Sequence, residues 1–122
     1  MINFKSKNRS DCSCFFVVHI KRTANGFLQS CGKAMRFYIA TGLVNAEHAR
    51  KAAEVLRRNG HEQTYDWTTH GDIRHEGAER MSEVAFNELR AVRDAELVVA
   101  LLPGGQGTHT ELGINYLFSS SQ

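Results

Sequence analysis

In the stretch LLPGGQGTHTELG (Leu101–Gly113), near the end of the chain, Gly104, Gly105 and Gly107 lie close in sequence to the acidic residue Glu111. An apolar run ends at Pro103, the glycines follow, and THTELG reads as the start of a helix. A helix N-terminus favours the ionised form of a carboxylate by about 0.3–1 kcal/mol. An ionised, partly desolvated carboxylate at a crevice can act as a nucleophile. Glu111 is therefore a candidate nucleophile, and the glycines would let a substrate approach the backbone closely.

Two other roles for this stretch stay open. Thr108 and Glu111 have the spacing of a capping box, in which the glutamate bonds back to the N–H group of the cap residue. The glycine loop could instead cradle a phosphate with its free N–H groups. However, the loop lacks the Lys-Ser/Thr ending of a P-loop, and Glu111 would repel a phosphate bound there.

Strands and helices alternate along the segment that carries this stretch. Short β-prone runs occur at Met35–Ala40, His61–Trp67 and Ala95–Pro103. A helix that begins after Asn45 and stops at Gly60 follows the first run. A second helix precedes the last run, and a third follows the glycine loop. This order predicts an α/β fold with an open parallel sheet, a Rossmann- or flavodoxin-like three-layer sandwich of repeated strand–helix units.

Ligands on such sheets bind beyond the carboxyl ends of the strands. Two loops meet this condition, Thr41–Asn45 after the first strand and Gly104–Thr110 after the third. If the first and third strands are neighbours, both loops face one crevice.

The first 34 residues differ from the rest of the chain. Residues 1–34 carry a formal charge of +5, whereas residues 35–122 carry −3. All three cysteines lie in this first segment, and an odd count without a pairing pattern suits a reducing cytoplasm. We expect two parts, a flexible or weakly ordered extension at 1–34 and a folded domain at 35–122. Met35 could even be the natural start.

Two alternatives for the first segment stay open. The basic residues before its apolar run could belong to a secretory signal, although His19 and Lys21 cut the run short. Cys12, Cys14 and Cys31 with His19 could bind zinc, although the spacing is not a standard one.

Composition sets limits on the partners. The chain is 42% hydrophobic and 23% charged, as in ordinary soluble globular proteins. Its formal net charge of +2 is too small to indicate binding to nucleic acid or membranes. The apolar run Cys14–Ile20 is too short to span a bilayer. His70 and His75 flank an acidic loop, but their spacing fits no standard metal site.

From Met35 onward the sequence resembles the nucleoside 2-deoxyribosyltransferase family. The resemblance rests on MRFYIATGL, GHEQTYDWT and VRDAELVVALLPGGQGTHTELG, of which the last is the most specific. It implies that Glu111 attacks the anomeric carbon of a 2′-deoxyribonucleoside, that the base leaves, and that a second base or water takes up the sugar. This is the two-step logic of retaining glycosyl transfer.

The resemblance also implies roles for other residues. Tyr38 matches a tyrosine near the nucleophile, and Glu88 stands where the family usually has an aspartate that helps to bind the base and manage its proton. The substrate-binding positions are Thr41, Gly42, Asp66, Trp67, Gly105, Gly107 and Thr108. Trp67 could stack on a base or belong to the core. No metal and no cofactor are implied. The partners implied are a nucleoside or nucleotide, a free nucleobase and further copies of the chain in a homo-oligomer.

The end of the chain departs from the family. Where the family continues with another strand, and often completes its site from a neighbouring subunit, this chain ends INYLFSSSQ. Three functions therefore stay open: base exchange between deoxyribonucleosides, hydrolysis of the N-glycosidic bond of a nucleoside 5′-monophosphate, and nucleotide binding by a non-catalytic remnant.

Overall fold

The computed structural model describes residues 2–5, 15–20 and 34–120. Its strands are β1 (Ile2–Lys5), β2 (Phe15–Ile20), β3 (Arg36–Ala40), β4 (Glu62–Gln63) and β5 (Leu97–Leu102). Its helices are α1 (Ala46–Arg58), α2 (Ala78–Asp94) and α3 (Gln106–Ser120), with the short 3₁₀ turns η2 (Leu43–Asn45) and η3 (Trp67–Thr69). Within these residues the strands form one sheet in the order β1-β2-β5-β3-β4.

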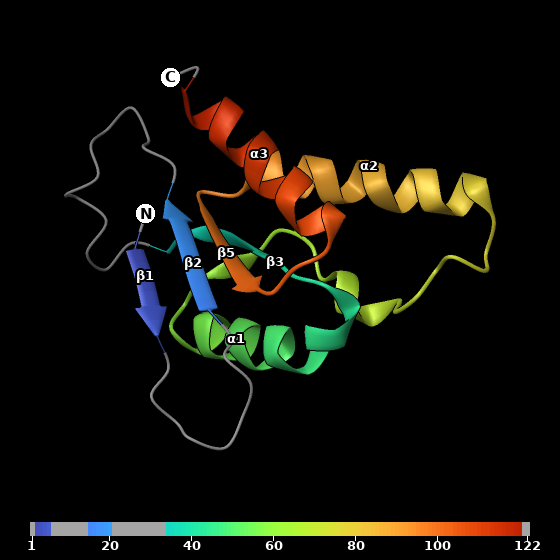
Figure 1. Cartoon of the computed structure of the whole chain (residues 1–122). Coiled ribbons are helices and arrows are strands. Elements are labelled where there is room, and N and C mark those ends of the chain that lie inside the picture. Colours follow the sequence, from blue (N-terminus) through green and yellow to red (C-terminus); the bar gives the residue numbers. More distant parts are fainter. Residues whose placement is uncertain (1, 6–14, 21–33, 121–122) are drawn as a thin grey trace.

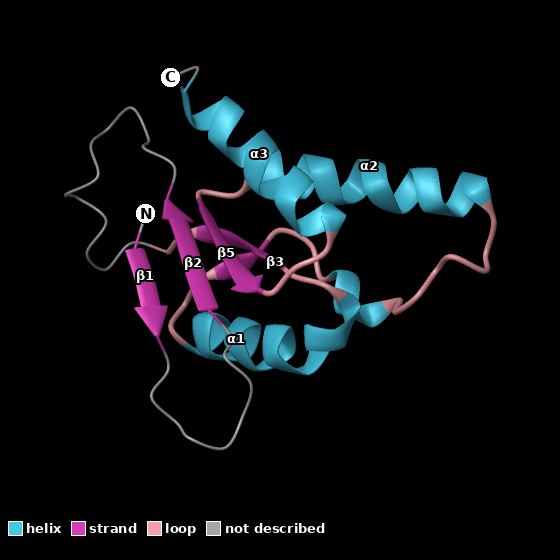
Figure 2. Cartoon of the chain, in the orientation of Figure 1, coloured by secondary structure: helices cyan, strands magenta, loops and turns pink. Residues whose placement is uncertain are grey.

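The strands β3, β4 and β5 form the parallel part of this sheet. β3 pairs in parallel with β4 on one side and with β5 on the other. α1 covers one face of the sheet, and α2 and α3 cover the other (Figure 1). The layers are equally clear when helices and strands are coloured separately (Figure 2). The chain therefore has the predicted α/β fold, built on a small three-stranded parallel sheet.

Burial explains the apolar run of β5. Five of its six residues are buried, as expected for a strand that has neighbours on both edges and helices on both faces. The fully buried side chains of β3, among them Phe37 and Ile39, pack in the same core. Since β5 and β3 lie side by side, their carboxyl ends meet at one edge of the sheet.

The first helix forms as predicted, but its N-terminal residue acts differently. α1 ends before Gly60, whose φ of +87° is a left-handed conformation that favours glycine. Asn45 precedes the helix, yet its side chain makes no capping hydrogen bond. The side chain instead contacts two loops at the end of the sheet, as described below.

The second parallel strand is much shorter than predicted. We expected a strand over His61–Trp67, whereas β4 covers two residues and Trp67 already begins a 3₁₀ turn. The reason is local: Asp66 Oδ1 accepts a hydrogen bond from the backbone N–H of Thr68 at 3.1 Å, and this bond turns the chain.

The N-terminal segment contributes to the sheet, although no regular structure was expected there. β1 pairs antiparallel with β2, and β2 pairs antiparallel with β5 over its whole length, from Phe15 opposite Leu102 to Ile20 opposite Leu97. The apolar run of residues 15–20 thus lies beside the most apolar strand of the domain. As a consequence, β5 is an inner strand and the sheet as a whole is mixed.

Candidate active site

The two loops expected to form the site lie next to each other. They follow β3 and β5, which are paired neighbours. A methyl group built on Gly42 would stand 3.7 Å from the backbone nitrogen of Gly105, which is ordinary van der Waals contact. The two loops therefore meet at the carboxyl edge of the sheet, where α/β proteins bind ligands.

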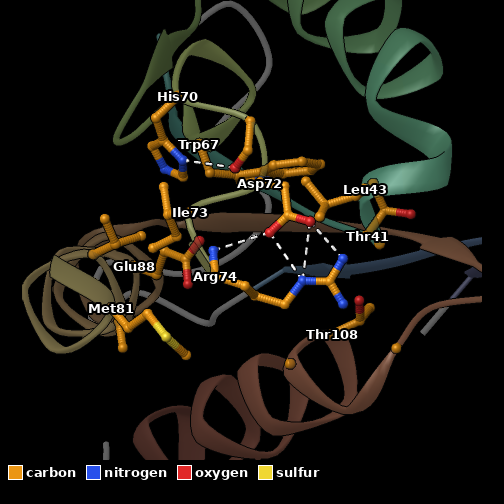
Figure 3. A pocket seen from close by; sticks show the side chains of 16 residues that line it. Thr41, Leu43, Trp67, His70, Asp72, Ile73, Arg74, Met81, Glu88 and Thr108 are labelled. Carbon is orange, nitrogen blue, oxygen red and sulfur yellow. Dashed lines mark hydrogen bonds and ion pairs between the residues drawn. The ribbon is translucent and has the colours of Figure 1, made fainter. Parts of the chain in front are cut away.

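A pocket of about 270 Å³ opens beside these loops (Figure 3). Most of the sequence-predicted site residues line it: Thr41, Gly42, Trp67, Glu88, Gly105, Gly107 and Thr108. Apolar side chains of α2, including Met81 and Val84, complete one wall. Tyr38, Asp66 and Glu111 are not among the described residues that line the pocket.

Glu111 is buried beside the pocket and hydrogen bonded to Tyr38. The phenol of Tyr38 donates to Glu111 Oε1 at 2.6 Å. The Glu111 residue is 8% exposed and Tyr38 is fully buried. Thr108, about one helical turn before Glu111 on α3, lines the pocket. The candidate nucleophile therefore follows a pocket-lining residue on α3 but does not itself line the pocket.

Burial determines the protonation of this pair. It raises the pKa of Glu111 from 4.5 to about 8, although the hydrogen bond from Tyr38 acts in the opposite direction and the charge of Glu88 adds to the increase. The pKa of Tyr38 is raised far above its usual value, first by burial and then by the charges of Glu111 and Glu88. Tyr38 is thus a permanent hydrogen-bond donor.

Both sequence-based expectations for the environment of Glu111 need correction. α3 begins at Gln106, so Thr108 is inside the helix and the His109 N–H group bonds to Gly105 O. The described contacts therefore contain no capping box. Nor does the helix start keep Glu111 ionised near neutral pH, because Glu111 lies beyond the first turn and loss of water outweighs the dipole.

Glu88 reaches the pocket from α2. It is partly buried, and loss of water raises the pKa of its carboxyl group, while nearby His70 lowers it. Its charge acts on both Tyr38 and Glu111. Of the three residues predicted to be catalytic, Glu88 lines the pocket, whereas the hydrogen-bonded Tyr38 and Glu111 are buried and do not line it.

Asp66 and Trp67 have structural contacts. Asp66 caps η3 through Thr68, and its other carboxylate oxygen lies 3.8 Å from an Arg57 nitrogen. Trp67 donates its indole N–H to Ile39 O at 2.8 Å and is 5% exposed. Trp67 lines the pocket from this fixed position, whereas Asp66 does not reach it.

The loop between η3 and α2 supplies pocket residues that sequence reasoning missed. His70, Asp72, Ile73 and Arg74 all line the pocket. The Arg74 Nε–H group donates to both Asp72 carboxylate oxygens, at 2.9 and 3.0 Å. These bonds hold the pKa of Asp72 well below its usual value. In Figure 3 the guanidinium group of Arg74 extends between Asp72 and Thr108. The density of polar residues in HGDIRHEG was the available signal.

Metal binding finds no support in the described part of the chain. Among these residues, no three His, Cys, Asp or Glu side chains cluster to hold an ion. The zinc alternative falls on Cys12, Cys14 and Cys31, which lie outside the described residues, and on the side chain of His19, which is also not described. The signal-peptide alternative falls largely outside them as well.

Comparison of the chain with models of protein families, with curated proteins and with solved structures found no match in any of the three. No helix within residues 2–5, 15–20 and 34–120 is long and apolar enough to cross a membrane.

Proposed function

We propose that the chain is a nucleoside 2-deoxyribosyltransferase-like enzyme that breaks the N-glycosidic bond of a 2′-deoxyribonucleoside and transfers the sugar to another nucleobase. The observation that carries this proposal is the buried Tyr38–Glu111 pair, with its 2.6 Å hydrogen bond, beside a pocket lined by Glu88. Two carboxyl groups of unequal environment at one site suit glycosidic chemistry, which needs a nucleophile and a proton donor.

The first step uses both carboxyl groups. An oxygen of ionised Glu111 attacks C1′ of the deoxyribose, and the C1′–N bond breaks. The electron pair of that bond goes to the base nitrogen, which takes a proton from Glu88. The sugar is then held as an ester of Glu111. The raised pKa of Glu88 favours the protonated form that this step needs.

The second step reverses the roles. A ring nitrogen of the incoming base attacks C1′, the ester bond breaks, and the Glu111 carboxylate is restored. The proton of the incoming base returns to Glu88. Tyr38 steadies the carboxylate in both steps, because its hydrogen bond favours the ionised form of Glu111.

A second candidate is hydrolysis of a nucleoside 5′-monophosphate, with water in place of the incoming base. Arg74 supports hydrolysis of a monophosphate, because Arg74 supplies a cationic side chain among the described residues that line the pocket. Its partner Asp72 already neutralises much of that charge, so base exchange remains the primary proposal.

The experiment that tests both is product analysis by chromatography. The protein is incubated with thymidine and adenine, or with a deoxynucleoside monophosphate alone. Exchange yields deoxyadenosine and thymine, whereas hydrolysis yields free base and sugar phosphate. Glu111→Gln should lower turnover by about a thousandfold or more, because the amide cannot form the ester. Glu76→Gln is the control, since Glu76 pairs with Arg80 at the surface. Unchanged turnover in Glu111→Gln would exclude the proposed nucleophile.

A further inference from the structure

Asn45 connects the two loops of the pocket. It is the buried last residue of η2, directly before α1, and makes no cap bond to that helix. Its side-chain Nδ2 donates to Thr41 Oγ1 at 3.1 Å and to Pro103 O at 3.1 Å. The first bond lies within the loop after β3, and the second reaches the loop after β5. The Asn45 amide group therefore bonds to both loops, and these loops carry the Thr41–Gly42 and Gly105–Thr108 walls of the pocket.

The hydroxyl of Thr41 strengthens the same connection. It donates to Leu101 O, the last buried residue of β5, at 2.8 Å, while it accepts the bond from Asn45. A hydroxyl has a single hydrogen to donate, so Thr41 retains only acceptor capacity for a ligand. The three bonds form a continuous network from β5, through Thr41 and Asn45, to Pro103. All three take place between buried or partly buried groups, where an unpaired partner is costly.

This network ends at Pro103, three residues before α3 begins at Gln106. Pro103 is followed within a few residues by Gly105, Gly107 and Thr108, which line the pocket, and then by Glu111. The backbone of Gly42 is close to that of Gly105, so a small shift between the loops changes the pocket itself. Misplacement of reacting groups by about 1 Å can lower a rate about a hundredfold.

We propose that Asn45 is a positioning residue that fixes the loop after β5, and with it the start of α3, against the loop after β3. The structural half of this proposal depends only on the hydrogen bonds described above. The effect of this positioning on turnover rests on the proposed function, because the network would align Glu111 with a sugar held near Thr41 and Gly42.

The structural part is tested by amide hydrogen exchange, read by mass spectrometry, in the full chain. Asn45→Asp keeps the shape of the side chain but removes the donors, and Asn45→Ala removes the side chain. Both should make exchange at residues 101–108 faster by about tenfold or more, with residues 36–40 unchanged. Asn59→Asp is the matched control, since its amide also bonds a carbonyl, Val55 O at 2.8 Å, but at the exposed end of α1. Unchanged exchange at 101–108 in both Asn45 variants would overturn the proposal.

A pair of Thr41 variants decides the matter if the Asn45 variants fold poorly. Thr41→Val removes the hydroxyl and should also accelerate amide exchange at residues 101–108. Thr41→Ser retains the hydroxyl, so its amides at 101–108 should exchange at the wild-type rate. If both variants exchange at the wild-type rate, the network does not hold the loop and the proposal is wrong.

The consequence for turnover is measured separately. In a protein that exchanges bases, Asn45→Asp should lower kcat by about tenfold or more while KM changes little, because alignment rather than contact is lost. A rise in KM alone would contradict a positioning role. If the wild type shows no turnover at all, the proposed function fails, and the exchange experiment still decides the role of Asn45.

Discussion

Tyr38 and Glu111 are joined by a 2.6 Å hydrogen bond across 73 positions of sequence, from the centre of β3 to α3. Both side chains are buried, so this bond is a buried polar contact between the sheet and the helix that carries the candidate nucleophile. Because burial raises the pKa of Glu111 to about 8, the folded protein retains the Glu111 proton to a higher pH than an unfolded chain does. Stability and activity should therefore respond to pH in opposite directions.

The stability of the protein should fall as the pH rises from about 5 to about 8. Over this range an unfolded chain has lost the Glu111 proton while the folded protein retains it, so the folded state binds more protons. Glu111→Gln removes this difference and keeps a similar shape. We expect the variant to match the wild type near pH 5 and to exceed it by about 1–4 kcal/mol of unfolding free energy near pH 9.

Urea unfolding at several pH values measures this effect. Glu76→Gln, which changes a surface pair, should follow the wild type throughout. A wild-type stability that rises between pH 5 and pH 8, after subtraction of the control, would contradict the buried neutral state of Glu111.

Activity should show the opposite trend. If Glu111 is the nucleophile, the rate of base exchange should increase with pH as the Glu111 carboxylate forms, until Glu88 loses the proton that it must donate. Tyr38→Phe removes the hydrogen bond that lowers the pKa of Glu111, so the rising limb should move to higher pH. The measurement is kcat/KM as a function of pH in both proteins. A limb that stays in place in Tyr38→Phe would show that another group controls it.

The alternation of strands and helices was predictable because it depends on local patterns. The unbroken apolar run of β5 and the Gly60 stop of α1 each follow from a few neighbouring residues. The short β4 was not predictable in the same way, because the same residues are compatible with a longer strand until Asp66 caps the next turn. Nor did the pattern of residues 1–34 indicate that β2 would pair with β5, from Phe15 opposite Leu102 to Ile20 opposite Leu97.

In the candidate site, too, some features could be predicted from the sequence and others could not. Position after β3 and β5 was enough to select the two loops, and the family resemblance selected Thr41, Gly42 and Gly105 within them. The protonation of Glu111 was not predictable, because helix position favours the ionised form and only tertiary packing shows how deeply the group is buried. His70 and Arg74 were not predicted to line the pocket. They lie in the loop between η3 and α2, and only the folded path of this loop brings them to the pocket.

Gly104 should tolerate no larger side chain, unlike its neighbour. A methyl group at Gly104 would stand 2.5–2.7 Å from three atoms of the buried Thr108 side chain, so the first turn of α3 must move. Gly104→Ala should lower the free energy of unfolding by about 1–3 kcal/mol. Gly105→Ala is the matched control, because nothing lies within 4 Å of its added methyl group. Thermal unfolding of the two variants compares them directly, and equal melting temperatures would show that Thr108 can give way.

The pairing of β2 with β5 predicts that a proline in β2 is strongly destabilising. Val17 lies opposite Ala100 on one side and Asn3 on the other, so its strand is internal to the sheet. Val17→Pro removes a backbone donor from an inner strand, which proline does not tolerate. We expect a loss of about 3 kcal/mol or more of unfolding free energy. Val17→Thr keeps the N–H group and the branched shape, so it should retain most of the stability. Chemical denaturation of both variants tests the pairing: if Val17→Pro unfolds at the wild-type midpoint, residues 15–20 do not belong to the stable sheet, and β5 is an edge strand in solution.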